Sequence, residues 1–195
     1  MALQRGDLDG YIRSQEKAVA IYERVGDVRS RAVALGEMAR VKSARGRVDE
    51  AVQLYREALA LLPDNVEAHN RLAAILHETG RFDEALQAYR EALALSPRDV
   101  ETRNGLATIL RETGRREEAL QMYREALTLV PHNAEARNGL AAILRETGRL
   151  DEALQVYREA LASFPDDMEA RNGLATILRE TGRLDDEPEL HQYES

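Results

Sequence analysis

The chain contains no cysteine, which excludes disulfide bonds, thiol chemistry and cysteine-ligated zinc. No stretch approaches the roughly 18 apolar residues of a membrane-spanning helix, and the segment after Met1 lacks the apolar run of a secretory signal peptide. Basic residues form no cluster, because the 27 Lys and Arg alternate with 35 Asp and Glu, for a net charge of −8. These absences predict a soluble, cytoplasmic protein that binds neither membranes nor nucleic acid.

Motifs of catalysis and metal binding are missing as well. The sequence holds no His-Glu-x-x-His, no glycine-rich phosphate loop and no Gly-x-Ser-x-Gly, the patterns that would indicate metalloprotease, nucleotide or hydrolase chemistry. His69 and His77 share one predicted helix but lie two turns apart, too far for one metal ion. The acidic run 185–187 is interpreted as a solvated tail. We therefore expect a protein that is not an enzyme and has no metal or cofactor.

The dominant feature is an internal repeat. Gly46-Arg47-Val48-Asp49-Glu50-Ala51 recurs in closely similar form from Gly80, Gly114, Gly148 and Gly182, each 34 residues after the last. A fixed period of this length is typical of stacked helix pairs, in which each unit buries its apolar face only against its neighbours.

One repeat, residues 80–113, predicts two helices. Apolar residues at helical spacing run from Ala85 to Leu95, and Asp83 is expected to cap this helix. Pro97 ends it, Asp99 caps the next helix, and Gly114 terminates that one. The Asn-Gly pairs at 104–105, 138–139 and 172–173 fall inside the predicted first helices, so the repeat overrides their usual preference for hairpin turns.

Small residues at Ala51, Ala58, Ala73, Ala85, Ala92 and Ala107 are predicted to allow close packing of the helices. Glycine inside a helix costs roughly 1 kcal/mol relative to alanine. Its retention at Gly105, Gly139 and Gly173 therefore indicates a close approach there, by a ligand or by a neighbouring helix.

The pattern Ala–Tyr–Ala–Pro recurs at 51/55/58/63, 85/89/92/97, 119/123/126/131 and 153/157/160/165, and Leu-Ala recurs at 72–73, 106–107, 140–141 and 174–175. With these residues the chain resembles the tetratricopeptide repeat family. The resemblance implies an all-α fold, an α-solenoid of antiparallel helix pairs wound into a right-handed superhelix. The family's usual bulky residue near the start of each first helix is replaced by His69, Arg103, Arg137 and Arg171, whose heads are expected to reach carboxylates.

The resemblance organises the whole chain, 1–195, as one array. Residues 6–45 resemble the longer, 40-residue repeat of kinesin light chains and bacterial signalling proteins, and 46–181 hold four 34-residue periods. Residues 182–195 are expected to form a truncated helix or an acidic tail. Because both ends break off within a repeat, the sequence is interpreted as a segment of a longer protein or as an array that stacks end to end.

In this family one arc of each first helix lines the concave face, and that arc is the candidate binding site. Its predicted ligand-contacting residues are Asn70, Asn104, Asn138, Asn172, Arg111, Arg145, Arg179, Thr108 and Thr176. Asparagine amides both donate and accept, so a row of them suits the backbone of an extended peptide. The alternative is duplication: any residue, idle or useful, recurs in copies this similar, and the Arg–Glu stripe then forms only salt bridges between repeats.

The sequence thus predicts a protein-interaction scaffold that binds a peptide or a partner helix. The carboxylate clamp of chaperone-binding relatives is absent, because glutamate occupies the second arc position (Glu67, Glu101, Glu135, Glu169) and glycine the sixth in three repeats. Two alternatives stay open: self-association through apolar faces at the array ends, and service as the regulatory or sensor arm of a larger signalling protein.

Overall fold

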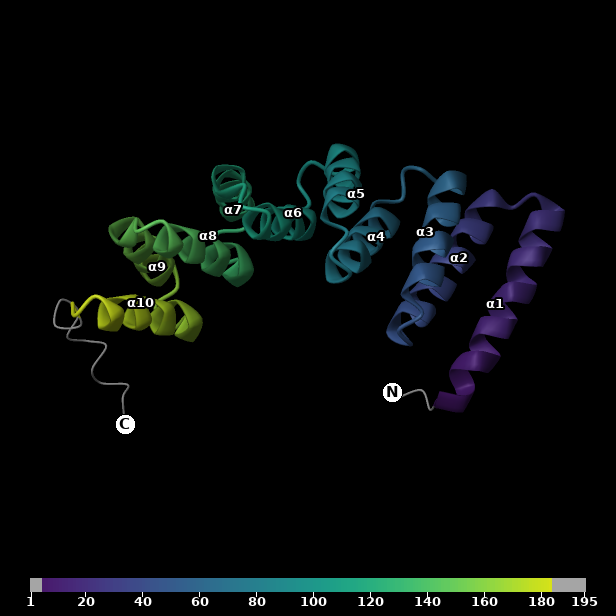
Figure 1. Ribbon diagram of the computed structural model, residues 1–195, viewed down its shortest axis with the longest axis horizontal. Helices are drawn as coiled ribbons and strands as arrows, with labels where there is room; N and C mark the ends of the chain where they lie inside the picture. Colours follow the sequence, from purple (N-terminus) through teal and green to yellow (C-terminus); the bar gives the residue numbers. More distant parts are fainter. Residues whose placement is uncertain (1–4, 184–195) are drawn as a thin grey trace. The chain divides into compact units, whose positions relative to one another are not determined.

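A computed structural model describes residues 5–183, and every regular element in that range is an α-helix. Within these residues, ten helices follow one another in sequence, and Figure 1 shows their arrangement. They are α1 (Arg5–Val25), α2 (Val28–Ala44), α3 (Val48–Leu61), α4 (Val66–Glu78), α5 (Phe82–Leu95), α6 (Val100–Glu112), α7 (Arg116–Leu129), α8 (Ala134–Glu146), α9 (Leu150–Ser163) and α10 (Met168–Glu180). The expected all-α solenoid of helix pairs is confirmed. Of the tail expected at 182–195, residues 184–195 lie outside the described part.

The repeated glycine is what ends each first helix. Gly80, which follows α4, has a φ of 73°, a left-handed conformation that glycine adopts without the strain of a Cβ atom. Its N–H donates to the His77 carbonyl at 2.9 Å, and the N–H of Arg81 donates to the Leu76 carbonyl at 2.8 Å. This pair of bonds is the Schellman ending of a helix. It lets the chain reverse in a short turn and enter α5.

Acidic and amide side chains begin the first helices of the repeats. The carboxylate of Asp99 accepts from the N–H of Glu101 at 3.0 Å, which confirms its predicted capping role, and Asn65, Asn133 and Asp167 cap α4, α8 and α10 in the same way. The prediction for Asp83 was wrong. Because the turn at Gly80 needs only one further residue, α5 starts at Phe82 with Arg81 at its N-cap. Asp83 lies inside the first turn, where a negative charge favours the helix dipole.

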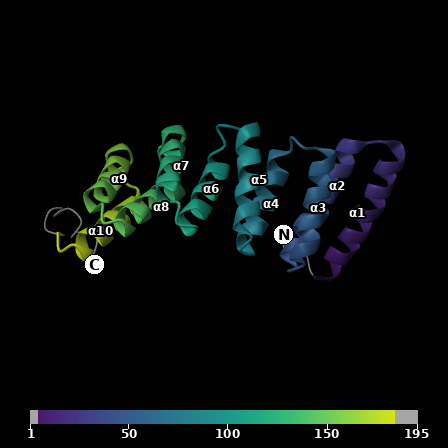
Figure 2. The ribbon, with the colours of Figure 1, turned by 45° about the horizontal axis from the view of Figure 1, so that its top comes forward.

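The chain divides into two compact units, residues up to Thr102 and residues from Arg103, and each is described by itself. In the first unit successive helices from α1 to α5 pack side by side (Figures 1 and 2). Alanines lie at these contacts: Ala51, Ala73, Ala85 and Ala92 have no exposed surface. The predicted close packing through small residues is therefore confirmed.

The second unit repeats this construction with α7 to α10, again packed in chain order. Leu120, Ile143 and Leu154 have no exposed surface and Leu144 has 1%. The Asn-Gly pairs lie within α6, α8 and α10, as predicted, so the side chains that follow them are held on rigid helices.

Candidate functional site

The four predicted asparagines fall into two groups. Asn138 on α8 and Asn172 on α10 are exposed, whereas Asn70 on α4 is half-buried and Asn104 on α6 retains only 2% of its surface. The structure therefore brings Asn138 and Asn172 to the surface of the second unit, at equivalent positions of consecutive repeats. It withdraws Asn104 into the protein.

Asn70 and Asn104 use their amides to join one repeat to the next. Asn104 Nδ2 donates to Asn133 Oδ1 and to Glu135 Oε2, both at 3.0 Å. Asn70 Nδ2 donates to Asp99 Oδ2 at 3.1 Å, and Asn70 Oδ1 accepts from the Thr102 hydroxyl at 2.8 Å. These bonds hold the cap of the following helix, so both asparagines have a structural use.

The hydroxyl groups of the buried tyrosines lie beside the predicted site residues. Tyr123 Oη lies 3.0 Å from Thr108 Oγ1. In the next repeat Ala142 occupies the position of Thr108, and Tyr157 Oη donates instead to Asn138 Oδ1 at 3.2 Å. Burial raises the pKa of Tyr123 and of Tyr157, so both hydroxyls remain protonated donors at neutral pH.

Gly139 and Gly173 are explained by these same tyrosines. A Cβ atom on Gly139 would lie 2.3 Å from Cζ of Tyr123, and one on Gly173 would lie 2.3 Å from Cζ of Tyr157. Of the two explanations that the sequence left open, the neighbouring helix accounts for both glycines. The rings of Tyr123 and Tyr157 therefore pack directly against Gly139 and Gly173.

The predicted arginines line the same face of α6, α8 and α10. Arg111 is half-buried, and Arg145 and Arg179 are exposed. Arg145 Nη1 lies 3.3 Å from Glu180 Oε1 of the next repeat, the inter-repeat pair that duplication alone predicts. Both side chains are about half exposed, so this pair contributes on the order of 0–1 kcal/mol. Thr176 donates to the backbone carbonyl of its own helix at Asn172.

Of the four residues that replace the family's bulky residue, His69 and Arg137 are buried, and Arg103 and Arg171 are partly buried. Arg103 Nε donates to Glu125 at 3.1 Å, and Arg137, only 1% exposed, pairs with Asp167 at 2.6 Å and Glu169 at 3.5 Å. These contacts confirm that the heads of these two arginines reach carboxylates. Arg171 donates to the Pro165 carbonyl at 2.5 Å. At the equivalent position, His69 Nε2 lies 2.9 Å from the Pro63 carbonyl, so this nitrogen carries the proton.

Two pockets were not foreseen from the sequence. One, of about 600 Å³, lies among α3, α4 and α5, and the other, of about 520 Å³, lies among α7, α8 and α9. They are copies two repeats apart: Leu59, Leu72 and Leu76 of the first correspond to Leu127, Leu140 and Leu144 of the second. The only sequence signal was the recurrence of these leucines on consecutive helices.

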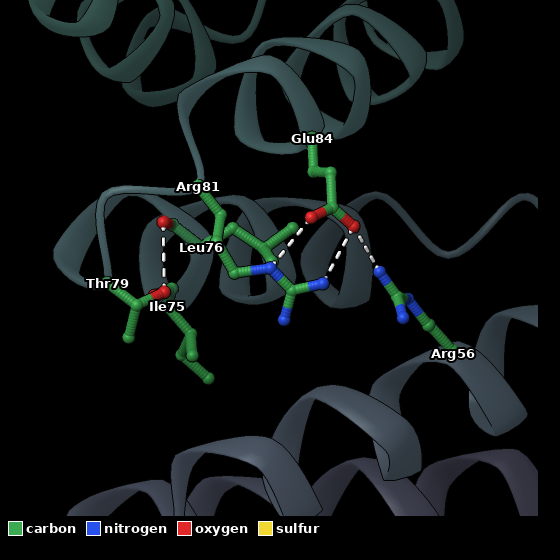
Figure 3. A network of polar contacts seen from close by, with 6 residues as sticks. All are labelled: Arg56, Ile75, Leu76, Thr79, Arg81 and Glu84. Carbon is green, nitrogen blue, oxygen red and sulfur yellow. Dashed lines mark hydrogen bonds and ion pairs between the residues drawn. The ribbon is translucent and has the colours of Figure 1, made fainter.

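An ion-pair network borders the first of these pockets (Figure 3). The Glu84 carboxylate accepts from Arg81 Nε at 2.7 Å and from Arg56 of the preceding second helix. The bonds from Arg81 lower the pKa of Glu84, and Arg47 and Lys42 lower that of Glu50, its equivalent one repeat earlier, to about 2. The contact of Arg56 on α3 with Glu84 on α5 ties two consecutive second helices together, whereas Lys42 joins α2 to Glu50 at the start of α3.

Matches to family models establish the protein family to which this chain belongs. Two tetratricopeptide repeat models match, one over residues 37–100, 104–167 and 151–192, the other over residues 1–64. The chain belongs to the tetratricopeptide repeat family. Such arrays are helical-repeat scaffolds for protein interaction and are typically non-enzymatic. No curated protein matches the chain.

Solved structures of tetratricopeptide repeat proteins share the fold. MamA matches with a TM-score of 0.70 and 19% identity, over 83% of this chain and 88% of MamA. MamA from Desulfovibrio magneticus RS-1 matches with a TM-score of 0.68 and 16% identity, over 83% of this chain and 91% of that protein's chain. YrrB is described as a TPR protein with an unusual peptide-binding site. It matches with a TM-score of 0.63 and 21% identity, over 82% of each chain. Identities this low establish a common fold.

Within residues 5–183, no helix is both long and apolar enough to cross a membrane. Within the same range, no group of three or more His, Asp or Glu side chains is arranged to hold a metal ion.

Proposed function

We propose that this scaffold binds an extended peptide along the first-helix face of its second unit, defined as the exposed arc of α8 and α10. The observation that carries the proposal is the pair Asn138 and Asn172. Both amides are exposed at equivalent positions of consecutive repeats, whereas the amide nitrogens of Asn70 and Asn104 donate hydrogen bonds within the protein.

The surroundings of Asn138 suit a peptide backbone. Its Oδ1 accepts from Tyr157, which orients the amide so that the Nδ2 hydrogens remain available to a peptide carbonyl. The tyrosine is buried, and the ring of Tyr123 fills the space that a side chain on the adjacent Gly139 would need. A side-chain amide recognises backbone groups without demanding a sequence, and Arg145 and Arg179 add charge-assisted contacts to acidic side chains.

Similarity to YrrB supports the proposal. That protein is described as having a peptide-binding site, and it shares the fold of this chain. This similarity supports peptide binding by a protein of this fold. It says nothing about the roles of individual residues.

The proposal is tested by selecting short peptides from a random-sequence library on the full chain, then measuring their affinity by fluorescence anisotropy. Asn138→Ala/Asn172→Ala is compared with Gln87→Ala/Gln155→Ala, which removes two exposed amides from second helices. We expect the asparagine variant alone to lose affinity, by about tenfold per lost hydrogen-bonded amide. Equal loss in both variants, or no selected peptide at all, would contradict the proposal.

A second candidate function is self-association at the α1–α2 turn. Ile21, Val25 and Val28 are 50%, 64% and 49% exposed, and neighbouring exposed apolar side chains are typical of interfaces. Light scattering across a range of concentrations tests this idea. A mass that rises with concentration in the wild type and stays constant in Ile21→Ser/Val25→Ser supports it, and a constant monomer mass in both excludes it.

A further inference from the structure

The pocket of about 600 Å³ among α3, α4 and α5 has the size of a small-molecule site. Leu59 of α3, Leu72 and Leu76 of α4, and Ala88 of α5 give it apolar walls. Sites for small molecules typically have a volume of roughly 300–1,000 Å³ and a mostly apolar lining, with a few polar groups that fix the ligand. The polar groups of this pocket therefore indicate which ligand it fits.

Acidic side chains outnumber basic ones around the pocket. Asp83, Glu84 and Glu91 line it beside one arginine, Arg56. Arg56 and the neighbouring Arg81 both pair with Glu84 (Figure 3), so three carboxylates are balanced by only two guanidinium groups. The net charge is negative, which favours a cationic ligand.

His69 lines the same pocket and is buried, with 6% of its surface exposed. Its Nε2 donates to the Pro63 carbonyl at 2.9 Å, which leaves a lone pair on Nδ1 of the neutral imidazole. Nδ1 lies 3.3 Å from Glu91 Oε2 and has no hydrogen-bond partner in the described part of the chain. The other Glu91 oxygen, Oε1, accepts from Gln87 at 2.6 Å. Two acceptors thus face each other, and a buried acceptor without a donor is costly.

The following repeat contains the donor that this site lacks. One period later, Arg103 stands in the register of His69 and Glu125 in that of Glu91. Arg103 Nε donates to Glu125 at 3.1 Å. That carboxylate receives a hydrogen bond from a permanent cation, whereas Glu91 faces a neutral ring. The site at His69 is therefore one positively charged donor short of its copy.

We propose that this pocket binds a small apolar amine, whose ammonium group donates to His69 Nδ1 and to Glu91 Oε2. An ammonium has several N–H donors and no acceptor, so one group serves both atoms, and its bond to the carboxylate is charge-assisted. Glu91 is exposed, so its side chain can turn to admit the ammonium between the two acceptors. The apolar body of the ligand lies on the leucines of the pocket. This site is separate from the peptide-binding face proposed on α8 and α10.

NMR titration of the isotope-labelled full chain tests the inference with two probes, phenethylammonium and phenethyl alcohol, which share an apolar body and differ in charge. We expect the ammonium compound to bind about tenfold more tightly, the effect of one charge-assisted contact, and to shift the imidazole resonances of His69. Glu91→Gln should abolish this preference. His69→Arg should abolish it as well, because it supplies the cation found at Arg103.

Glu57→Gln is the matched control and should retain the preference. Glu57 is exposed and holds the register of Glu91 one repeat earlier, where Leu35 replaces His69. Equal affinity for the two probes, equal effects of Glu91→Gln and Glu57→Gln, or no binding of either probe would overturn the inference. An imidazolium at His69 in the free protein at neutral pH would also overturn it, because a proton on Nδ1 would already join the two acceptors. Circular dichroism of each variant confirms that the helices are intact.

Discussion

The ring of Tyr123 on α7 occupies the space that a side chain on Gly139 of α8 would need. A Cβ atom at residue 139 would lie 2.3 Å from Cζ and 2.7 Å from the hydroxyl oxygen of Tyr123. The same relationship joins Tyr157 and Gly173. The glycine is therefore part of the packing between consecutive helices, and the tyrosine forms the floor of the proposed binding face.

Gly139→Ala should destabilise the chain. Alanine favours a helix by about 1 kcal/mol over glycine, but overpacking against Tyr123 costs about 1–3 kcal/mol, so we expect a net loss in the free energy of unfolding measured in urea. Gly10→Ala is the control, because it lies in α1 with nothing within 4 Å of its Cβ position and should stabilise. Equal stabilisation by both substitutions would show that Tyr123 does not need the space.

Asp167 is the main ion-pair partner of Arg137. Asp167→Asn keeps the cap of α10, since asparagine fills the same role at Asn65 and Asn133, but it removes the charge that faces a buried guanidinium. Breaking one partner of a buried ion pair typically costs about 3 kcal/mol or more. Thermal and urea unfolding should show this loss.

The matched control for that variant is Asn65→Asp, which makes the opposite change in a cap where the buried Leu35, and not an arginine, stands in the register of Arg137. It should shift the free energy of unfolding far less. A cost at residue 167 no larger than that at residue 65 would show that the cap, and not the ion pair, holds Arg137.

Acid should weaken the contact between α2 and the start of α3, where Lys42 and Arg47 pair with Glu50. Hydrogen bonds from Arg47 and Lys42 lower the pKa of Glu50 to about 2, so the folded state favours the ionised form more than the unfolded state does. This stabilisation is fully present above the unfolded value near 4.5 and is lost as the pH falls towards 2. In urea unfolding, the difference between wild type and Glu50→Gln should shrink over that window.

Glu57→Gln serves as the charge-matched control for Glu50→Gln, since both residues are exposed on α3. A difference between wild type and Glu50→Gln that stays constant from pH 7 down to pH 2 would contradict the assignment of this ion pair.

The fold was largely predictable because short-range sequence features determine where each helix begins and ends. A left-handed glycine, a capping side chain and apolar residues at helical spacing specify each helix within its own repeat. The error at Asp83 arose from the length of one turn, where capping residues and first-turn acids look alike in sequence.

The sequence could not predict which of the four asparagines are buried and which are exposed. The four amides are identical in the repeat pattern, yet Asn104 is buried against Asn133 and Glu135 while Asn138 is exposed. That difference depends on contacts about 30 residues away and on which side chain caps the following helix. The pockets between second helices were missed for the same reason, since three helices build each one.

The most direct test of the account is NMR of the isotope-labelled full chain during titration with a selected peptide. The side-chain amide resonances of Asn138 and Asn172, and the backbone amides of α8 and α10 around them, should shift as the peptide is added. The side-chain amides of Gln87 and Gln155 on the second helices should not. Shifts confined to α7 and α9, with the two asparagines unaffected, would place the ligand elsewhere and contradict the proposed binding face.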